Sequence, residues 1–161
     1  KAYADTKVSK DTTKQLTHHT IVDDIDATDV VYISLGEIDA ENTTNSNKNL
    51  PLLAPVAGKL LKVFVRSSSA MNTVDLTFKL YTRTVSQSTN GAAAVVGAQT
   101  GAGPTNKTMV TYDFTTGLDS GVGSETNAIV AGDKVLLSVE SSGATSNQNI
   151  FIPCLWEWDL S

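Results

Sequence analysis

The sequence TVDLTFKLYT, residues 73–82, decides the fold because its apolar and polar residues alternate without a break. On a β-strand, one face would carry the apolar set Val74, Leu76, Phe78 and Leu80. On an α-helix the same side chains would scatter around the axis, because a helix repeats about every 3.6 residues. The alternation therefore predicts a half-buried antiparallel strand with its apolar face in the core.

Further strand patterns lie on both sides of this segment. In residues 59–67, Leu61, Val63 and Val65 are expected on one side of a strand and Leu60 on the other. The closing residues 149–160 place one apolar set on a single face: Ile150, Ile152, Cys154, Trp156 and Trp158. Residues 29–36, 107–115 and 134–140 also have strand patterns. Seven or eight strands joined by Gly, Ser and Asn turns predict an all-β, antiparallel β-sandwich or jelly roll.

Residues 86–106 interrupt this pattern with a stretch rich in Gly and Ala. We expect a long surface loop there, with room for a short edge strand near residues 94–96. Small residues would also suit a contact loop, because they let another backbone approach closely.

The length of 161 residues fits one domain. Residues 1–28 are polar and lack a core period, so we expect an extended N-terminal arm there and the sandwich domain over residues 29–161. Arms of this kind become ordered by lying on another molecule. The residues expected to contact a partner are the apolar ones of the arm and the last tryptophan: Tyr3, Leu16, Ile21, Val22, Ile25 and Trp158.

Composition and charge argue against several classes of partner. The net charge is -5, and Lys and Arg are scattered singly, so no basic patch predicts nucleic-acid binding. No apolar run approaches the roughly 20 residues that cross a membrane. The first residues are polar, with no signal-peptide core. The single cysteine, Cys154, lies in an apolar run and is expected to be a buried small hydrophobe, which fits folding in a reducing cytosol.

The sequence also contains no recognisable catalytic motif. His18 and His19 are adjacent, so on a strand they point to opposite faces, and no third histidine exists. A cupin-type metal enzyme, the enzymatic alternative, is therefore poorly supported. The acidic run at residues 23–29 lacks the glycine and glutamate spacing of a calcium-binding helix-loop-helix, which leaves only a weak cation site open. We predict no enzyme activity, no cofactor and no resident metal.

Three short stretches resemble known families. PVAGKLLKV at residues 55–63 and AGDKVLLSV at residues 131–139 resemble strand entries of jelly rolls in the tumour-necrosis-factor and C1q superfamily. IPCLWEWD at residues 152–159 resembles the end of small virion proteins of tailed bacteriophages. The resemblance implies a homotrimeric capsid decoration (cement) protein, head fibre or tail-fibre module.

The functional expectation is a virion protein that binds the major capsid protein or other virion proteins. It would lie on the capsid surface after assembly in the host cytoplasm, and it would bind neither nucleic acid nor membrane. The alternative is a receptor-binding or glycan-binding module of a phage head or tail fibre. Exposed Tyr, Trp and Asn side chains would carry that second function.

Overall fold

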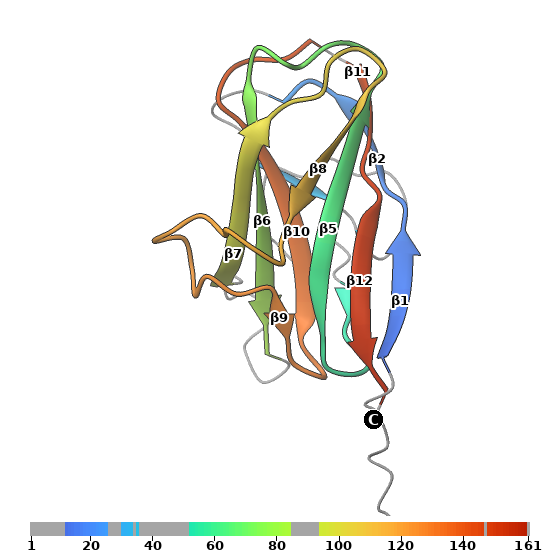
Figure 1. Ribbon diagram of the computed structural model, residues 1–161, viewed down its shortest axis with the longest axis vertical. Helices are drawn as coiled ribbons and strands as arrows, with labels where there is room; N and C mark the ends of the chain where they lie inside the picture. Colours follow the sequence, from blue (N-terminus) through green and yellow to red (C-terminus); the bar gives the residue numbers. More distant parts are fainter. Residues whose placement is uncertain are drawn as a thin grey trace, which may run out of the picture.

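The computed structural model describes residues 12–25, 30–33, 35, 52–84, 94–146 and 148–160. Within these ranges every regular element is a β-strand. The strands form two antiparallel sheets that face each other across a single core (Figure 1). The prediction of an all-β antiparallel sandwich is confirmed.

The larger sheet contains seven strands. These are β1 (Thr12–Thr17), β2 (Thr20–Asp23), β5 (Gly58–Ser67), β8 (Met109–Asp113), β9 (Ala128–Ile129), β11 (Gln148–Phe151) and β12 (Cys154–Asp159). The smaller sheet contains five strands. These are β3 (Val31–Ile33), β4 (Leu52–Leu53), β6 (Asp75–Arg83), β7 (Ala94–Ala102) and β10 (Lys134–Ser141).

Several strands share one position in a sheet, which reveals the topology. In four places, two strands that are consecutive in the chain lie one after the other in the same position of a sheet: β1 and β2, β3 and β4, β8 and β9, and β11 and β12. The twelve strands therefore fill eight positions. When these eight positions are numbered in chain order, the larger sheet has the spatial order 1, 8, 3, 6. The smaller sheet has the order 2, 7, 4, 5. This is the strand order of a jelly roll, in which most connections cross from one sheet to the other.

The core confirms the alternation seen in the sequence. Leu76, Phe78 and Leu80 of β6 are completely buried. The five apolar residues expected on one face of residues 149–160 are all buried as well, Cys154 and both tryptophans included. Trp156 and Trp158 stack with ring centroids 5.9 Å apart. Burying aromatic rings of this size contributes a large share of the hydrophobic stabilisation.

Pro153 explains why the last strand position is split into β11 and β12. The pairing with β5 keeps one register across the break, from Phe151 opposite Arg66 to Cys154 opposite Val63. The Phe64 amide still donates to the Pro153 carbonyl at 2.8 Å. Proline has no N–H, so Pro153 cannot donate the reciprocal hydrogen bond to β5. The hydrogen bonding between the strands is therefore interrupted, although their register does not change.

The expected facing of β5 is wrong at one residue. The register shifts by one between Leu155, opposite Lys62, and Trp156, opposite Leu60, which makes Leu61 the extra residue of a β-bulge. The bulge turns Leu60 into the core beside Val63, whereas simple alternation put these two on opposite faces.

The expectation of a long loop at residues 86–106 is also wrong over much of its length, because β7 spans Ala94–Ala102 at the edge of the smaller sheet. The small residues of β7 do allow another backbone to approach closely, but that backbone belongs to the same chain. A Cβ added at Gly97 would lie 2.3 Å from the Thr126 carbonyl oxygen. The Thr126 amide donates to the Val96 carbonyl at 2.8 Å, and the Asp119 amide donates to the Ala98 carbonyl at 3.0 Å. Residues 114–127 thus cover the edge of β7 (Figure 1).

The boundary expected at residue 28 differs from the structure. Residues 12–17 pair with β12 and residues 20–23 pair with β11, so this part of the expected arm is an edge strand position of the larger sheet. Ile21 and Ile25 are buried in the core. Two spaced apolar residues in a polar stretch gave too short a pattern to predict a strand. Residues 1–11 and 26–29 lie outside the described residues.

Candidate binding surface on the larger sheet

The outer face of the larger sheet carries a group of apolar side chains that the core does not use. Strand registers place six of them on this face: Leu16, Val22, Phe64, Met109, Phe151 and Leu155. We call this set the apolar face. Four of its members are largely exposed, among them Met109 at 62% and Val22 at 59%. Phe64 and Leu155 are half-buried.

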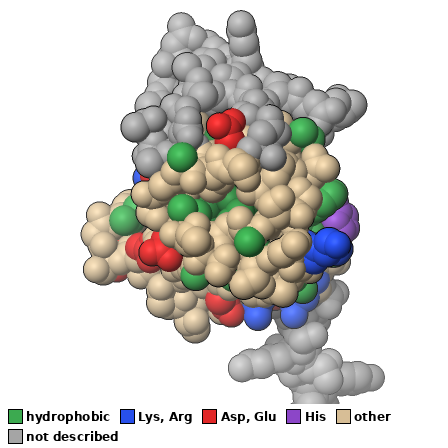
Figure 2. Space-filling model, turned by 90° about the horizontal axis from the view of Figure 1, so that it is seen from above, with side chains coloured by type: hydrophobic (Ala, Val, Ile, Leu, Met, Phe, Trp, Pro, Cys, Tyr) green, Lys and Arg blue, Asp and Glu red, His purple; other side chains and the backbone are tan. Residues whose placement is uncertain are grey.

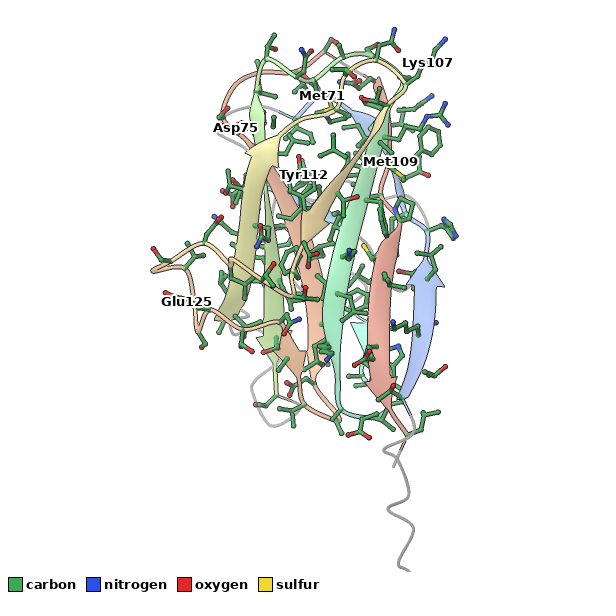
Figure 3. All side chains as sticks on the ribbon, in the orientation of Figure 1. Met71, Asp75, Lys107, Met109, Tyr112 and Glu125 are labelled. Carbon is green, nitrogen blue, oxygen red and sulfur yellow. The ribbon has the colours of Figure 1, made fainter. Side chains whose placement is uncertain are left out.

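Cross-strand pairing brings these side chains together. Leu16 on β1 lies directly opposite Leu155 on β12. Phe151 on β11 lies opposite Arg66 on β5, and Arg66 lies opposite Met109 on β8. Figure 3 labels Met109 on β8. Directly opposed side chains in an antiparallel pair have Cβ atoms about 5 Å apart, so they touch. The apolar face therefore runs across six strands, which fill four neighbouring positions of the larger sheet.

Charged pairs border the apolar face on the side toward β9. Lys62 lies 3.3 Å from Asp113, and Lys59 lies 2.9 Å from Glu157. Hydrogen bonds from Thr115, and then the neighbouring Lys62, hold the pKa of the Asp113 carboxyl below its ordinary value. The surface thus combines apolar side chains with one arginine, Arg66, among them and charged pairs along one side, and aromatic residues, Met and Arg are enriched at protein–protein interfaces.

The outer face of the smaller sheet is different because its aromatic residues are buried. Tyr32 and Tyr81 pack with ring centroids 5.7 Å apart, and Leu136 completes their cluster. The Ser138 hydroxyl donates to the Tyr81 hydroxyl oxygen at 3.3 Å. Burial raises the pKa of Tyr32 to about 12. Among the described residues, Leu53 on β4 is the one large apolar side chain on a strand of the smaller sheet that is largely exposed, whereas the larger sheet has four.

The structure divides the residues expected to contact a partner. Leu16 and Val22 belong to the apolar face. Ile21, Ile25 and Trp158 are buried inside the chain, so their prediction as interface residues is corrected. Tyr3 lies outside the described residues.

Sequence reasoning missed four members of the apolar face: Phe64, Met109, Phe151 and Leu155. They occupy the positions that alternate with the core residues of their strands. Their apolar character was the available signal, because a face that simply meets water carries polar residues instead.

The part of the chain that the structure describes contains no cluster of metal-binding side chains. There, no three His, Cys, Asp or Glu side chains gather closely enough to hold a metal ion. Burial raises the pKa of the Cys154 thiol, which keeps it protonated and unreactive. The described ranges also contain no helix of membrane-spanning length and hydropathy.

Among the residues that the structure describes, the tyrosines and tryptophans expected to hold a glycan are not exposed. Every Tyr and Trp among the described residues is buried in one of the two apolar clusters: Tyr32, Tyr81, Tyr112, Trp156 and Trp158.

Comparison with known proteins adds little beyond the fold. No protein-family model and no curated protein matches the sequence. A solved structure of turnip yellow mosaic virus aligns over 98% of this chain and 85% of its own, with 12% identity and a TM-score of 0.36. A TM-score this low carries no argument about function, and the jelly roll stands on the strand order described above.

Proposed function

We propose that the protein is a non-enzymatic structural component of a virus particle, a capsid decoration (cement) protein of a tailed bacteriophage. In this proposal the apolar face of the larger sheet binds the major capsid protein. The observation that supports it is the exposure of Leu16, Val22, Met109 and Phe151 on one sheet face. Exposed apolar groups that share one surface are typical of a binding site.

The energetic effect of such binding is simple. Full burial of a large apolar side chain is worth about 1.5–3 kcal/mol, and the four exposed members have roughly half of that still to gain. A protein that binds only the assembled shell stabilises that shell by mass action. A decoration protein therefore needs an adhesive surface and a rigid support, which a jelly roll provides.

Two finer parts of the proposal concern residues 1–11 and the copy number. Residues 1–11, with Tyr3, are proposed as a further contact with the shell. The resemblance to phage decoration proteins also implies a homotrimer, which the mass of the native protein would test. Deleting residues 1–11 should weaken attachment to particles while thermal unfolding of the sandwich stays unchanged.

The central experiment is co-sedimentation of the purified protein with phage heads that lack it. The double variant Met109→Ser and Phe151→Ser should weaken binding at least about tenfold, which corresponds to 1.4 kcal/mol. Val130→Ser is the matched control, because Val130 is 66% exposed but lies between β9 and β10, away from the apolar face. Unchanged binding by the folded double variant would contradict the proposal. Selective binding to a glycan array instead would support the receptor-binding alternative.

A further inference from the structure

The edge formed by β1 and β2 presents a regular row of backbone groups to its surroundings. The amide of Ile152 donates to the His19 carbonyl at 2.8 Å, so the backbone groups of His19 point inward. In an antiparallel ladder every second residue bonds to the same neighbour. The pairing keeps one register from Thr12 to Asp23, so the even-numbered residues from 12 to 22 direct their N–H and C=O groups away from the sheet.

This edge is treated differently from the edge at β7. Residues 114–127 hydrogen-bond along β7 and cover it. By contrast, five of the six residues of β1 are exposed, and β1 is the outermost strand on its side of the sandwich (Figure 1). Figure 2 shows histidine, basic and apolar side chains on that same side of the molecule. Exposed strand edges are templates for pairing with another chain, and proteins normally protect them.

The sequence of this edge is self-complementary when the edges of two copies are placed antiparallel, with His19 of one copy opposite His19 of the other. Leu16 then faces Val22 of the second copy, and His18 faces Thr20. In the same register Lys14 faces Asp24, which puts opposite charges together at both ends. The first two pairs join even-numbered residues of β1 and β2 and the link between them, whose backbone groups point outward, and Lys14 with Asp24 continues the same register one residue beyond β2. A lysine on an edge strand usually discourages pairing, but here the register supplies a carboxylate opposite to it.

We propose that two copies of this chain join along the β1–β2 edge, in antiparallel register about His19, to form one continuous sheet across a two-fold axis. The pairing is isologous, so each contact occurs twice. It places Leu16 and Val22 of both copies side by side and thereby extends the apolar face from one subunit to the next. The inference rests on the edge alone and holds whether or not the partner of the apolar face is a capsid.

A proline substitution tests the backbone pairing. Thr20→Pro removes an outward N–H, and proline is tolerated on an edge strand whose N–H faces solvent. Sedimentation equilibrium of the wild-type chain should give an even number of 17.0 kDa copies: two, or six if the homotrimer proposed above forms through another surface and two trimers join along this edge. Thr20→Pro should halve that mass or weaken the association at least about tenfold, while Thr20→Val should match the wild type. A wild-type mass corresponding to one or three copies, or an unchanged mass for folded Thr20→Pro, would overturn the proposal.

A charge exchange tests the register and does not depend on how the proline variant folds. Lys14→Asp and Asp24→Lys should each weaken association, because each puts like charges opposite one another across the two-fold axis. The double variant restores opposite charges and should recover most of the wild-type association. If the double variant stays as weak as the single ones, the register about His19 is wrong. Binding of these variants to phage heads, measured separately, distinguishes failure of this edge from failure of the apolar face.

Discussion

The indole N–H of Trp158 donates a 2.8 Å hydrogen bond to the side-chain oxygen of Gln15. This bond joins a buried ring of the last strand to the edge strand β1. The Trp156 indole makes the equivalent bond, at 3.0 Å, to the Thr17 hydroxyl. Since β1 buries almost none of its own side chains, these two bonds and the backbone ladder hold it in place.

Replacing Gln15 with alanine should therefore loosen β1 specifically. The buried Trp158 N–H loses its partner, which costs about 1–3 kcal/mol. We expect a lower thermal midpoint and faster amide hydrogen exchange in β1 than in β6. Gln15→Glu keeps an acceptor oxygen and should behave nearly like the wild type. Equal exchange in β1 of Gln15→Ala and the wild type would show that the backbone ladder suffices.

The cover over β7 should depend on the absence of a side chain at Gly97. Gly97→Ala places a methyl group 2.3 Å from the Thr126 carbonyl oxygen, a backbone atom that can yield only if residues 114–127 move. We expect a loss of about 1–3 kcal/mol, as for other overpacked sites, and aggregation on warming, measured by light scattering. Gly101→Ala is the matched control in the same strand, because its nearest neighbour is the Tyr112 ring at 3.3 Å. If both variants unfold alike, the close approach at Thr126 is not what matters.

Stability should fall at alkaline pH because of the buried tyrosines. Burial raises the pKa of Tyr32 to about 12 and also raises the pKa values of Tyr81 and Tyr112 above 10.0. The unfolded chain therefore loses these protons first, and the free energy of unfolding decreases as pH rises from about 10 toward 12. Urea unfolding at a series of pH values measures this decline. Tyr112→Phe should flatten it, although the variant loses the hydrogen bond of Tyr112 to the Ala102 carbonyl.

The Cys154 thiol should react only when the protein opens. It is fully buried, and burial raises its pKa, so little thiolate exists in the native state. Alkylation with iodoacetamide at pH 8 should be slower than that of a free thiol by orders of magnitude and should accelerate in urea in parallel with unfolding. Rapid native-state alkylation would show that the β5–β12 region opens locally.

The sequence predicted the jelly roll because its long strands alternate cleanly and its turns carry glycine. It failed where pairing partners, rather than local pattern, decide the structure. Leu60 faces the core only because a bulge opposite Trp156 shifts the register, and nothing in residues 59–67 alone indicates that bulge. Gly97 and its neighbours form a strand because β6 and residues 114–127 bind them on both sides.

The candidate surface was harder to predict than the fold. Leu16, Ile21, Val22 and Ile25 were all expected to contact a partner, but only Leu16 and Val22 lie on the apolar face, and Ile21 and Ile25 are in the core. Alternate residues of β2 point to opposite faces, so Ile21 enters the core and Val22 points outward. The sequence did not predict this strand, so it could not separate the two sets. Phe151 and Met109 could have been recognised from their apolar character alone, but their adjacency depends on Arg66 of β5, which lies between them.

The pairing of Thr12 with Asp159 also constrains how this chain acquires its shape during synthesis. The strand β1 cannot pair until β12 has left the ribosome, so the larger sheet closes only after residue 159 has emerged. Until then the nascent chain exposes strands that await partners far along the sequence, a situation that slows folding and favours misassembly between neighbouring nascent chains. Production at low temperature or with chaperones should therefore raise the soluble yield.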